Sequence, residues 1–135
     1  MFTITAVVEG QRHSATPAAF VFPGGESQVT VPAGLQAQAD TANEFRIHAL
    51  LKSADDVMQL LMLTDALRRL NPAVPVHLDM PYVPYARQDR VCNPGEALGA
   101  AVFCKLINDQ QYATVTIVEP HSDAVSYTHL TLPTS

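Results

Sequence analysis

The sequence predicts an α/β domain with a mainly parallel sheet flanked by helices. Strand-like and helical stretches alternate from Phe45 onward, which is typical of this class. An apolar run over residues 74–80 ends in a polar, proline-rich loop, as strands of open α/β sheets do where they bind ligands. A length of 135 residues favours a single domain.

The amino-terminal part is rich in β-branched and aromatic residues. These predict three strands, over residues 2–8, 18–22 and 28–31. Residues 10–17 are polar and are expected to form a turn-like connection. Residues 23–26, Pro-Gly-Gly-Glu, are expected to form a hairpin turn, because glycine tolerates positive φ.

The next part contains the clearest helix. Residues 32–43 lack periodicity and predict a loop with at most a helical turn, and residues 45–50 alternate as a strand does. Ser53 is a good N-cap followed by acidic residues, and Asn71-Pro72 ends the pattern. The apolar residues of this helix recur at helical spacing and are expected to face the core: Val57, Leu60, Leu61, Leu63, Leu67 and Leu70. Met58 and Met62 are also expected to serve packing.

The second half repeats the strand–helix–strand order. Strands are expected over 74–80 and 114–118, with a helix over 94–109 between them. Asn93 suits the N-cap of that helix, with Pro94 in its first turn. His77 alternates with apolar neighbours, which predicts a histidine in the core or on a sheet face rather than a ligand. The expected buried stripe of the helix comprises Ala97, Leu98, Ala101, Val102 and Leu106.

The loop over residues 81–90, PYVPYARQDR, carries the most chemistry. Pro81 and Pro84 stiffen it, so it loses less entropy when a ligand binds. Arg87 and Arg90 present planar guanidinium groups that match phosphate oxygens. This combination predicts a phosphate-bearing ligand.

Gln88 suits a base edge or a ribose, because its amide both donates and accepts. Asp89 can hold the arginines or meet a metal through water. The amino end of the following helix is expected to face the loop, where free N–H groups favour an anion. The alternative is an ordinary surface loop that contains an Arg–Asp pair.

Composition narrows the function classes. A formal net charge of −5 argues against a general nucleic-acid binder. Cys92 and Cys104 lack metal-type spacing and are expected to be reduced thiols of a cytoplasmic protein. Neither a signal peptide nor a membrane-spanning run is expected from the pattern.

Several stretches together resemble ribose-phosphate pyrophosphokinase, also called phosphoribosyl pyrophosphate synthetase. PYVPYARQDR followed by the NPGEALGAAVFCKLI helix resembles the ATP-binding loop of that family. Phe22-Pro-Gly-Gly-Glu26 is similar to its Phe-x-Asn/Asp-Gly/Gln-Glu segment, and the helix VMQLLMLTDALRRL agrees with LMELLLMIDALKR. The resemblance covers residues 1–124.

The resemblance implies the amino-terminal half of a two-domain, phosphoribosyltransferase-like fold. The family transfers diphosphate from ATP to ribose 5-phosphate, giving phosphoribosyl pyrophosphate and AMP, with Mg²⁺. The family's second domain supplies the ribose 5-phosphate loop, so the fragment itself is expected to be inactive. The full-length protein is expected to form a homo-oligomer.

The resemblance also implies roles for individual residues. Arg87 and Gln88, with Asp89 and Arg90 beside them, are expected to bind ATP. Phe22, Gly24, Gly25 and Glu26 are expected to help hold adenine, often in a neighbouring subunit's site. Gly24 stands where the family usually has a polar side chain.

His121 matches the histidine of a family Asp-Leu-His-Ala stretch that contacts magnesium–ATP. The resemblance therefore implies a catalytic and metal-contacting role for His121. Here Glu119 and Pro120 replace the usual aspartate and leucine.

The last residues, 125–135, differ from the family. VSYTHLTLPTS alternates as a strand could, yet it resembles the translation of a sequencing-library adapter. This stretch is therefore interpreted as an adapter-derived tail outside the domain. Two alternative functions stay open: a non-catalytic regulatory homologue that binds nucleotide and assembles with active subunits, and a plain nucleotide-binding α/β domain.

Overall fold

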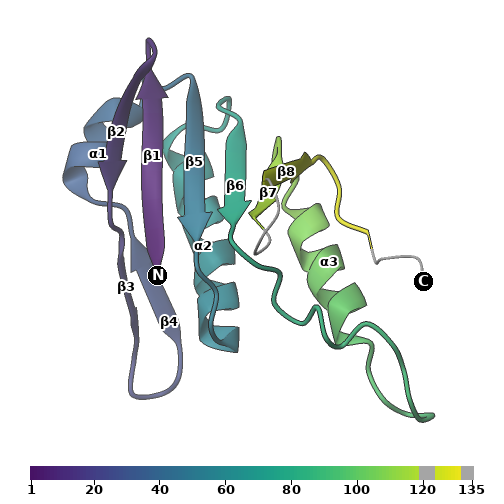
Figure 1. Ribbon diagram of the computed structural model, residues 1–135. Helices are drawn as coiled ribbons and strands as arrows, with labels where there is room; N and C mark the ends of the chain where they lie inside the picture. The colour runs from purple at the N-terminus through teal and green to yellow at the C-terminus, as the bar shows by residue number, and fades with distance from the viewer. Residues whose placement is uncertain (119–123, 132–135) are drawn as a thin grey trace.

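The computed structural model describes residues 1–118 and 124–131 of the chain. Its main sheet is mixed, with parallel pairing at the centre and antiparallel pairing at both rims (Figure 1). The predicted α/β class is confirmed. In spatial order the strands are β2 (Gln11–Ala15), β1 (Phe2–Val8), β5 (Glu44–Ala49), β6 (Val76–Met80), β7 (Val115–Val118) and β8 (Ala124–Tyr127).

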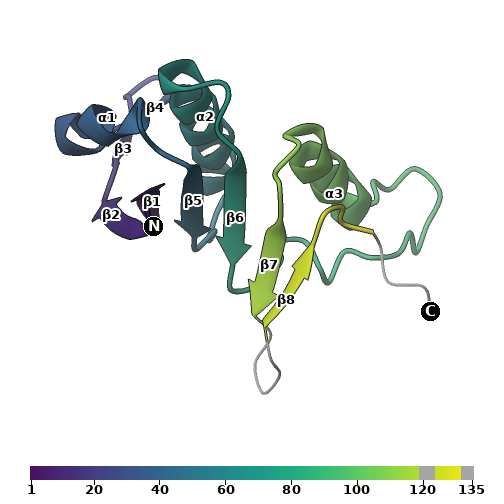
Figure 2. The same cartoon turned by 90° about the horizontal axis from the view of Figure 1, so that it is seen from above.

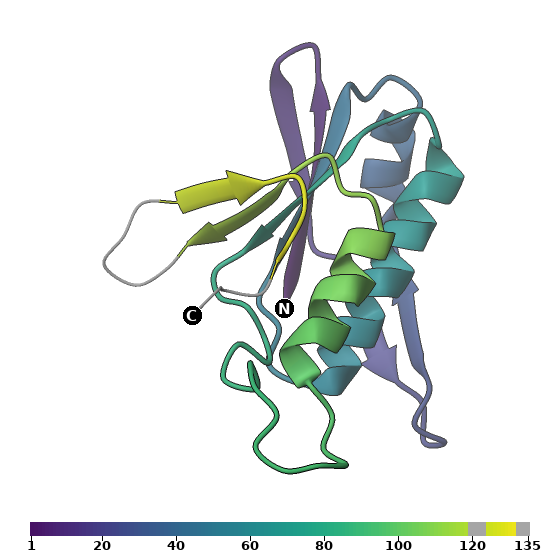
Figure 3. The ribbon, with the colours of Figure 1, turned by 90° about the vertical axis from the view of Figure 1, so that its right-hand side faces the viewer.

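A separate hairpin and three helices complete the described fold. The hairpin pairs β3 (Ala18–Val21) with β4 (Ser27–Thr30) and extends away from the sheet in Figure 1. The helices are α1 (Ala33–Ala39), α2 (Ala54–Leu70) and α3 (Gly99–Asp109). All three lie on the same face of the sheet, as Figures 2 and 3 show from two directions.

The core lies between this sheet face and the helices. Side chains alternate along a strand, so every second residue of β1, β5 and β6 points toward the helices and is buried. The largest fully buried side chains include Phe45, Ile47, Leu60, Leu63, Leu78 and Phe103. These strands and α2 therefore form the rigid base on which the loops after β6 and β7 stand.

Alternation places polar side chains on the opposite sheet face. Arg46 Nε lies 3.2 Å from Glu44 Oε2, and His77 Nε2 lies 3.1 Å from the same oxygen. His77 Nδ1 lies 2.7 Å from Thr114 Oγ1. The prediction of a face histidine is confirmed.

Helix α2 begins and ends as its sequence predicts. Ser53 is the N-cap and its Oγ accepts a hydrogen bond from Asp56 N at 3.2 Å, while Asn71 is the C-cap. The apolar stripe is buried at Val57, Leu60, Leu63 and Leu67. Met58 departs from the expected packing, because 53% of it is exposed, in a groove between α2 and α3.

Two amino-terminal expectations were wrong. Residues 11–15 form strand β2 rather than a turn, since Glu9 and Gly10 both adopt positive φ, 49° and 79°, and close a tight hairpin with β1. An edge strand needs few apolar residues, so the polar sequence of β2 did not show the alternating pattern that predicts a strand. The stretch expected to be loop contains helix α1, which buries Leu35 and Ala39.

The start of α3 is the main correction. The helix begins at Gly99, not at Pro94, and its N-cap is Leu98 without a side-chain cap. The Asn93 side chain instead donates from Nδ2 to Glu96 Oε1 at 2.6 Å, which holds a separate turn where Gly95 has φ of 92°. Asn93, which was expected to cap the helix, therefore closes a turn with Glu96 instead.

The buried face of α3 also differs from the expected stripe. The helix buries Ala100, Phe103 and Ile107, while 57% of Val102 is exposed. Of the expected stripe, Leu106 is also exposed. Burying Phe103 and Ile107, one turn apart, removes more apolar surface from water than burying the smaller Ala97 and Ala101.

The tail contributes an edge strand. Residues 124–127 form β8, which pairs antiparallel with β7, and Leu130 is buried against the core. Asn108 of α3 holds Leu130 by two hydrogen bonds, Nδ2 to O at 2.8 Å and N to Oδ1 at 2.7 Å. The strand-like alternation of the tail is thus realised in the structure.

Within the described residues, no helix is both long enough and apolar enough to cross a membrane.

Candidate functional site

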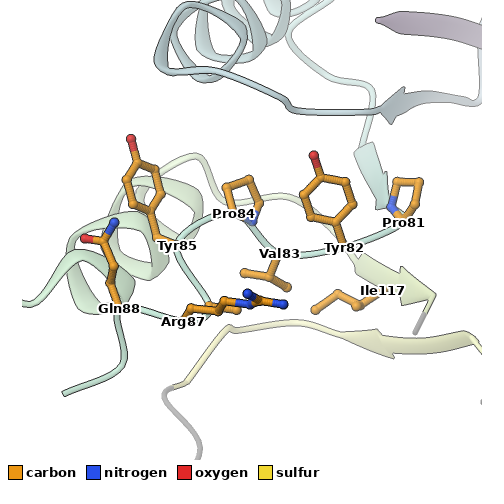
Figure 4. Close-up of a pocket in the computed structure, with 9 residues that line it drawn as sticks. Pro81, Tyr82, Val83, Pro84, Tyr85, Arg87, Gln88 and Ile117 are labelled. Carbon is orange, nitrogen blue, oxygen red and sulfur yellow. The ribbon is translucent and has the colours of Figure 1, made fainter. Parts of the chain in front are cut away.

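A hollow of about 690 Å³ opens where strands β6 and β7 end. Both strands are parallel, so their carboxyl ends meet at one edge, which is where open α/β sheets bind ligands. The volume lies in the range of small-molecule sites. The lining residues, drawn in Figure 4, are Pro81, Tyr82, Val83, Pro84, Tyr85, Ala86, Arg87, Gln88 and Ile117.

Two of the predicted site residues lie in this hollow. Arg87 and Gln88 both line it and are both exposed. Figure 4 shows the Arg87 guanidinium extending past Val83 toward Ile117, while Gln88 lies on the other side of the loop near α3. A ligand in the hollow would therefore meet a fixed positive charge on an otherwise largely apolar lining.

The loop is held in shape by its own backbone. Gln88 N donates to Tyr85 O at 2.9 Å, and Ala86 N donates to Val83 O at 3.3 Å. Tyr85 adopts φ of 63°, a left-handed conformation that is costly for a bulky residue and that clusters at functional sites. These turns direct the side chain of Arg87 into the hollow.

Side chains anchor the same loop to the helices. The Tyr85 ring lies 6.1 Å from the Phe103 ring of α3, centroid to centroid. The Tyr82 hydroxyl donates to the backbone carbonyl of Leu51, just before α2. The first half of the loop is thus fastened at Tyr82 and Tyr85, which reduces the ordering left for a ligand to impose.

The start of α3 does face the loop, as expected. Ala100 N donates to Gln88 O at 3.0 Å, so the first turn of the helix binds the loop backbone itself. This amide is therefore not free for an anion. In this chain the helix amino end positions the loop that carries Arg87.

Asp89 and Arg90 lie beside the hollow and do not line it. Arg90 Nε lies 3.5 Å from Asp89 Oδ1, so the Arg–Asp pair of the alternative interpretation is present. This ion pair does not include Arg87, whose side chain lines the hollow.

The hairpin residues lie apart from the hollow. Phe22 N donates to Glu26 O at 2.7 Å and Gly25 N donates to Phe22 O at 2.8 Å, which closes the predicted turn between β3 and β4. Gly25 has φ of 95°, and Gly24 lies beside it in the turn. Within one chain this turn lies apart from the loop that follows β6 (Figure 1), and it does not line the hollow.

The outer side of this hairpin is apolar. The rings of Phe20 and Phe22 meet edge to face, 4.8 Å apart, and each residue is 46% exposed. Directly after the turn, Gln59 of α2 donates from Nε2 to Ser27 Oγ at 3.3 Å. The hairpin is therefore attached to α2 while its turn projects into solvent.

His121 lies outside the described residues, as do Glu119 and Pro120. In residues 1–118 and 124–131, no group of three His, Cys, Asp or Glu side chains is placed to hold a metal ion. The described part of the hollow therefore offers a cation, an amide and aromatic rings rather than a carboxylate cage.

Sequence reasoning missed Ile117 and Val83 as lining residues. Ile117 belongs to β7 and reaches the hollow only because β7 pairs with β6. The signal for it was its place near the end of an apolar strand. Val83 sits between the two prolines and is half-buried by the fold of the loop.

Comparison with known proteins identifies the family. Residues 13–110 match the family described as the N-terminal domain of ribose phosphate pyrophosphokinase. The chain belongs to this family. The matched segment contains both the hairpin turn and the whole PYVPYARQDR loop, and the resemblance inferred from these motifs is confirmed.

Individual relatives agree with this assignment. Ribose-phosphate pyrophosphokinase of Halobacterium salinarum is 32% identical over 104 residues, which are 77% of this chain and 34% of that protein. The Bacillus subtilis protein of the same name is 27% identical over 112 residues, 77% of this chain and 32% of the relative. The Campylobacter jejuni protein is 38% identical over 71 residues, 53% of this chain and 23% of the relative. The chain spans about a third of the length of such relatives.

Proposed function

We propose that the hollow at the ends of β6 and β7 binds the phosphates of ATP. Arg87 would meet phosphate oxygens through a two-point contact, and Gln88 would meet the ribose or base through its amide. The support is that both side chains line one hollow of about 690 Å³ on an anchored loop within the family match. That shared placement is the observation that carries the proposal.

The reaction proposed for the whole protein is that of ribose-phosphate pyrophosphokinase. It transfers a diphosphoryl group from ATP to ribose 5-phosphate and releases AMP. Such a transfer depends on positioning and on neutralising phosphate charge, and Arg87 supplies a cation for the second task. Magnesium would arrive bound to ATP as part of the substrate, with His121 beside it.

The hairpin would act across a subunit interface. Phe22, Gly25 and Glu26 form a turn that projects from its own chain, away from the hollow. A neighbouring chain of a homo-oligomer in the cytoplasm would then receive this turn against the adenine ring. Gly24 offers no side chain for that contact, and Asp89 and Arg90 would assist from beside the phosphates.

The test is ATP affinity measured by calorimetry on the Arg87→Ala variant, ideally in the full-length protein. Loss of a charge-assisted contact is expected to weaken binding by more than about 1.5 kcal/mol, roughly tenfold or more. Arg12→Ala on the remote strand β2 is the matched control and should leave affinity unchanged. Unchanged ATP affinity in Arg87→Ala would remove this residue from the site.

A second candidate is a regulatory homologue that binds nucleotide without turnover and assembles with active subunits. The glycine at position 24 and the Glu119-Pro120 pair, where the family has other residues, favour it. An intact ribose 5-phosphate loop in the continuation of the reading frame would decide for the enzyme. Its absence would decide for the regulatory homologue.

A further inference from the structure

Gly99 lies directly against the side chain of Gln88. A methyl group added at Gly99 would lie 3.1 Å from Cδ and 3.2 Å from Cβ of Gln88, and closer still to its Oε1. Real Cβ atoms rarely come so close to a neighbour, and the Gln88 Cβ cannot swing away as the tip of a side chain can. A side chain at 99 would therefore displace the amide tip of Gln88 and shift its Cβ by a few tenths of an ångström, whereas glycine leaves both in place.

The same junction carries a backbone contact. The amide of Ala100, the next residue, donates to Gln88 O at 3.0 Å. One residue of the loop is thus held at its carbonyl and at its side chain by two adjacent residues of α3. Tyr85, at the other end of the turn, rests on Phe103 of the same helix.

We infer that Gly99 is a positioning residue for the nucleotide-binding loop: its missing side chain lets Gln88 pack against α3, and this contact sets the place from which Arg87 faces the hollow. The inference rests on the proposed function, because it assigns the purpose of this fit to ATP binding. Glycine lowers helix propensity relative to alanine within a helix, and Gly99 is the first residue of α3. The close approach to Gln88 explains its presence.

The experiment compares Gly99→Ala with Gly34→Ala in the 135-residue chain. Gly34 is also helical, in α1, and a methyl group there would meet nothing within 4 Å. We expect Gly99→Ala to weaken ATP binding by about fivefold or more in calorimetry, the scale of one lost polar contact. Gly34→Ala should stay within about twofold of the unaltered chain.

A double-mutant cycle separates positioning from a general structural effect. In a Gln88→Gly background, which removes Oε1, Cδ and Cβ together, the clash is absent, so Gly99→Ala should change ATP affinity by less than about twofold. Equal weakening in both backgrounds would overturn the inference. So would an unchanged affinity in Gly99→Ala if Arg87→Ala weakens binding.

A ligand-free measurement distinguishes this inference from the proposed function. Hydrogen exchange of the Ala100 amide should accelerate in Gly99→Ala and not in Gly34→Ala, because the bond to Gln88 O is disturbed. If the chain binds no ATP, the proposed function fails, and faster exchange still supports the positioning role. Unchanged exchange at Ala100 overturns that role whatever the chain binds.

Discussion

At the residue scale, two buried hydroxyl groups pair with each other in the core. Thr64 and Tyr112 are both buried, and their hydroxyl oxygens lie 2.6 Å apart, between α2 and the segment before β7. Thr64 also donates to Leu60 O at 2.9 Å. Buried hydroxyls are tolerated because they are paired, so this contact joins two elements of the scaffold under the site.

Burial raises the pKa of Tyr112 from its ordinary value of 10.0 to about 12, because the ionised phenolate would lose its hydration. The folded protein then holds this proton more tightly than the unfolded chain. Its contribution to stability is complete below pH 10 and is lost as the pH rises toward 12. We expect the free energy of unfolding to fall by up to about 3 kcal/mol across this interval.

Denaturant unfolding at several pH values measures this effect, with Tyr112→Phe as the control. The variant keeps the ring and the Thr64–Leu60 hydrogen bond, so it should fold, and its stability should decline less above pH 10. Parallel curves for the two proteins would show that Tyr112 does not titrate in this way.

At the scale of elements, the sequence was most reliable where independent signals agreed. The N-cap Ser53 and the spacing of leucines placed α2 correctly, because local capping and the apolar stripe agree. Strand β2 was missed, since an edge strand is held by backbone pairing with β1 rather than by its own side chains. The start of α3 was misplaced because Asn93 and Glu96 pair with each other in a turn.

Strand β8 gives the element-scale prediction. It covers the outer edge of β7, and Leu130 buries apolar surface held by Asn108. We expect a chain shortened to residues 1–124 to have a lower thermal midpoint and to associate at lower concentration, because an unpaired strand edge is a template for pairing. Light scattering and circular dichroism on the two chains measure both effects.

The matched control for this shortening is Asn108→Ala in the intact chain. It should lower the thermal midpoint while leaving β8 on β7, and so should not promote association. If the shortened chain stays monomeric with an unchanged midpoint, the tail contributes nothing to the fold. That result would fit the interpretation of residues 125–135 as an adapter-derived tail.

At the scale of the whole molecule, the described helices cover one face of the sheet (Figure 3). The hollow opens at the edge of that sheet where β6 and β7 end. The chain also spans about a third of the length of related ribose-phosphate pyrophosphokinases. The site for ribose 5-phosphate is expected in the second domain of the family. Under the proposed function, the 135 residues would offer ATP one of the two surfaces that the reaction requires.

We expect these 135 residues to bind ATP without releasing AMP when ribose 5-phosphate and Mg²⁺ are supplied. Catalysis requires both substrates to be held in one geometry, and binding one of them provides little of that advantage. A coupled AMP-release assay measures the outcome, with a full-length relative as the positive control. Release of AMP that depends on ribose 5-phosphate would contradict the prediction.

By itself, the sequence determined the α/β class, the helix α2, most of the strands and the identity of the loop that carries Arg87 and Gln88. These follow from local pattern, capping and motif, which act over a few residues. Only the tertiary structure decided that Ile117 lines the hollow, that Gln88 rests on Gly99 and that the hairpin turn lies apart from Arg87. Those outcomes depend on which strands pair and which helix face is buried, and both are set by contacts between residues far apart in the chain.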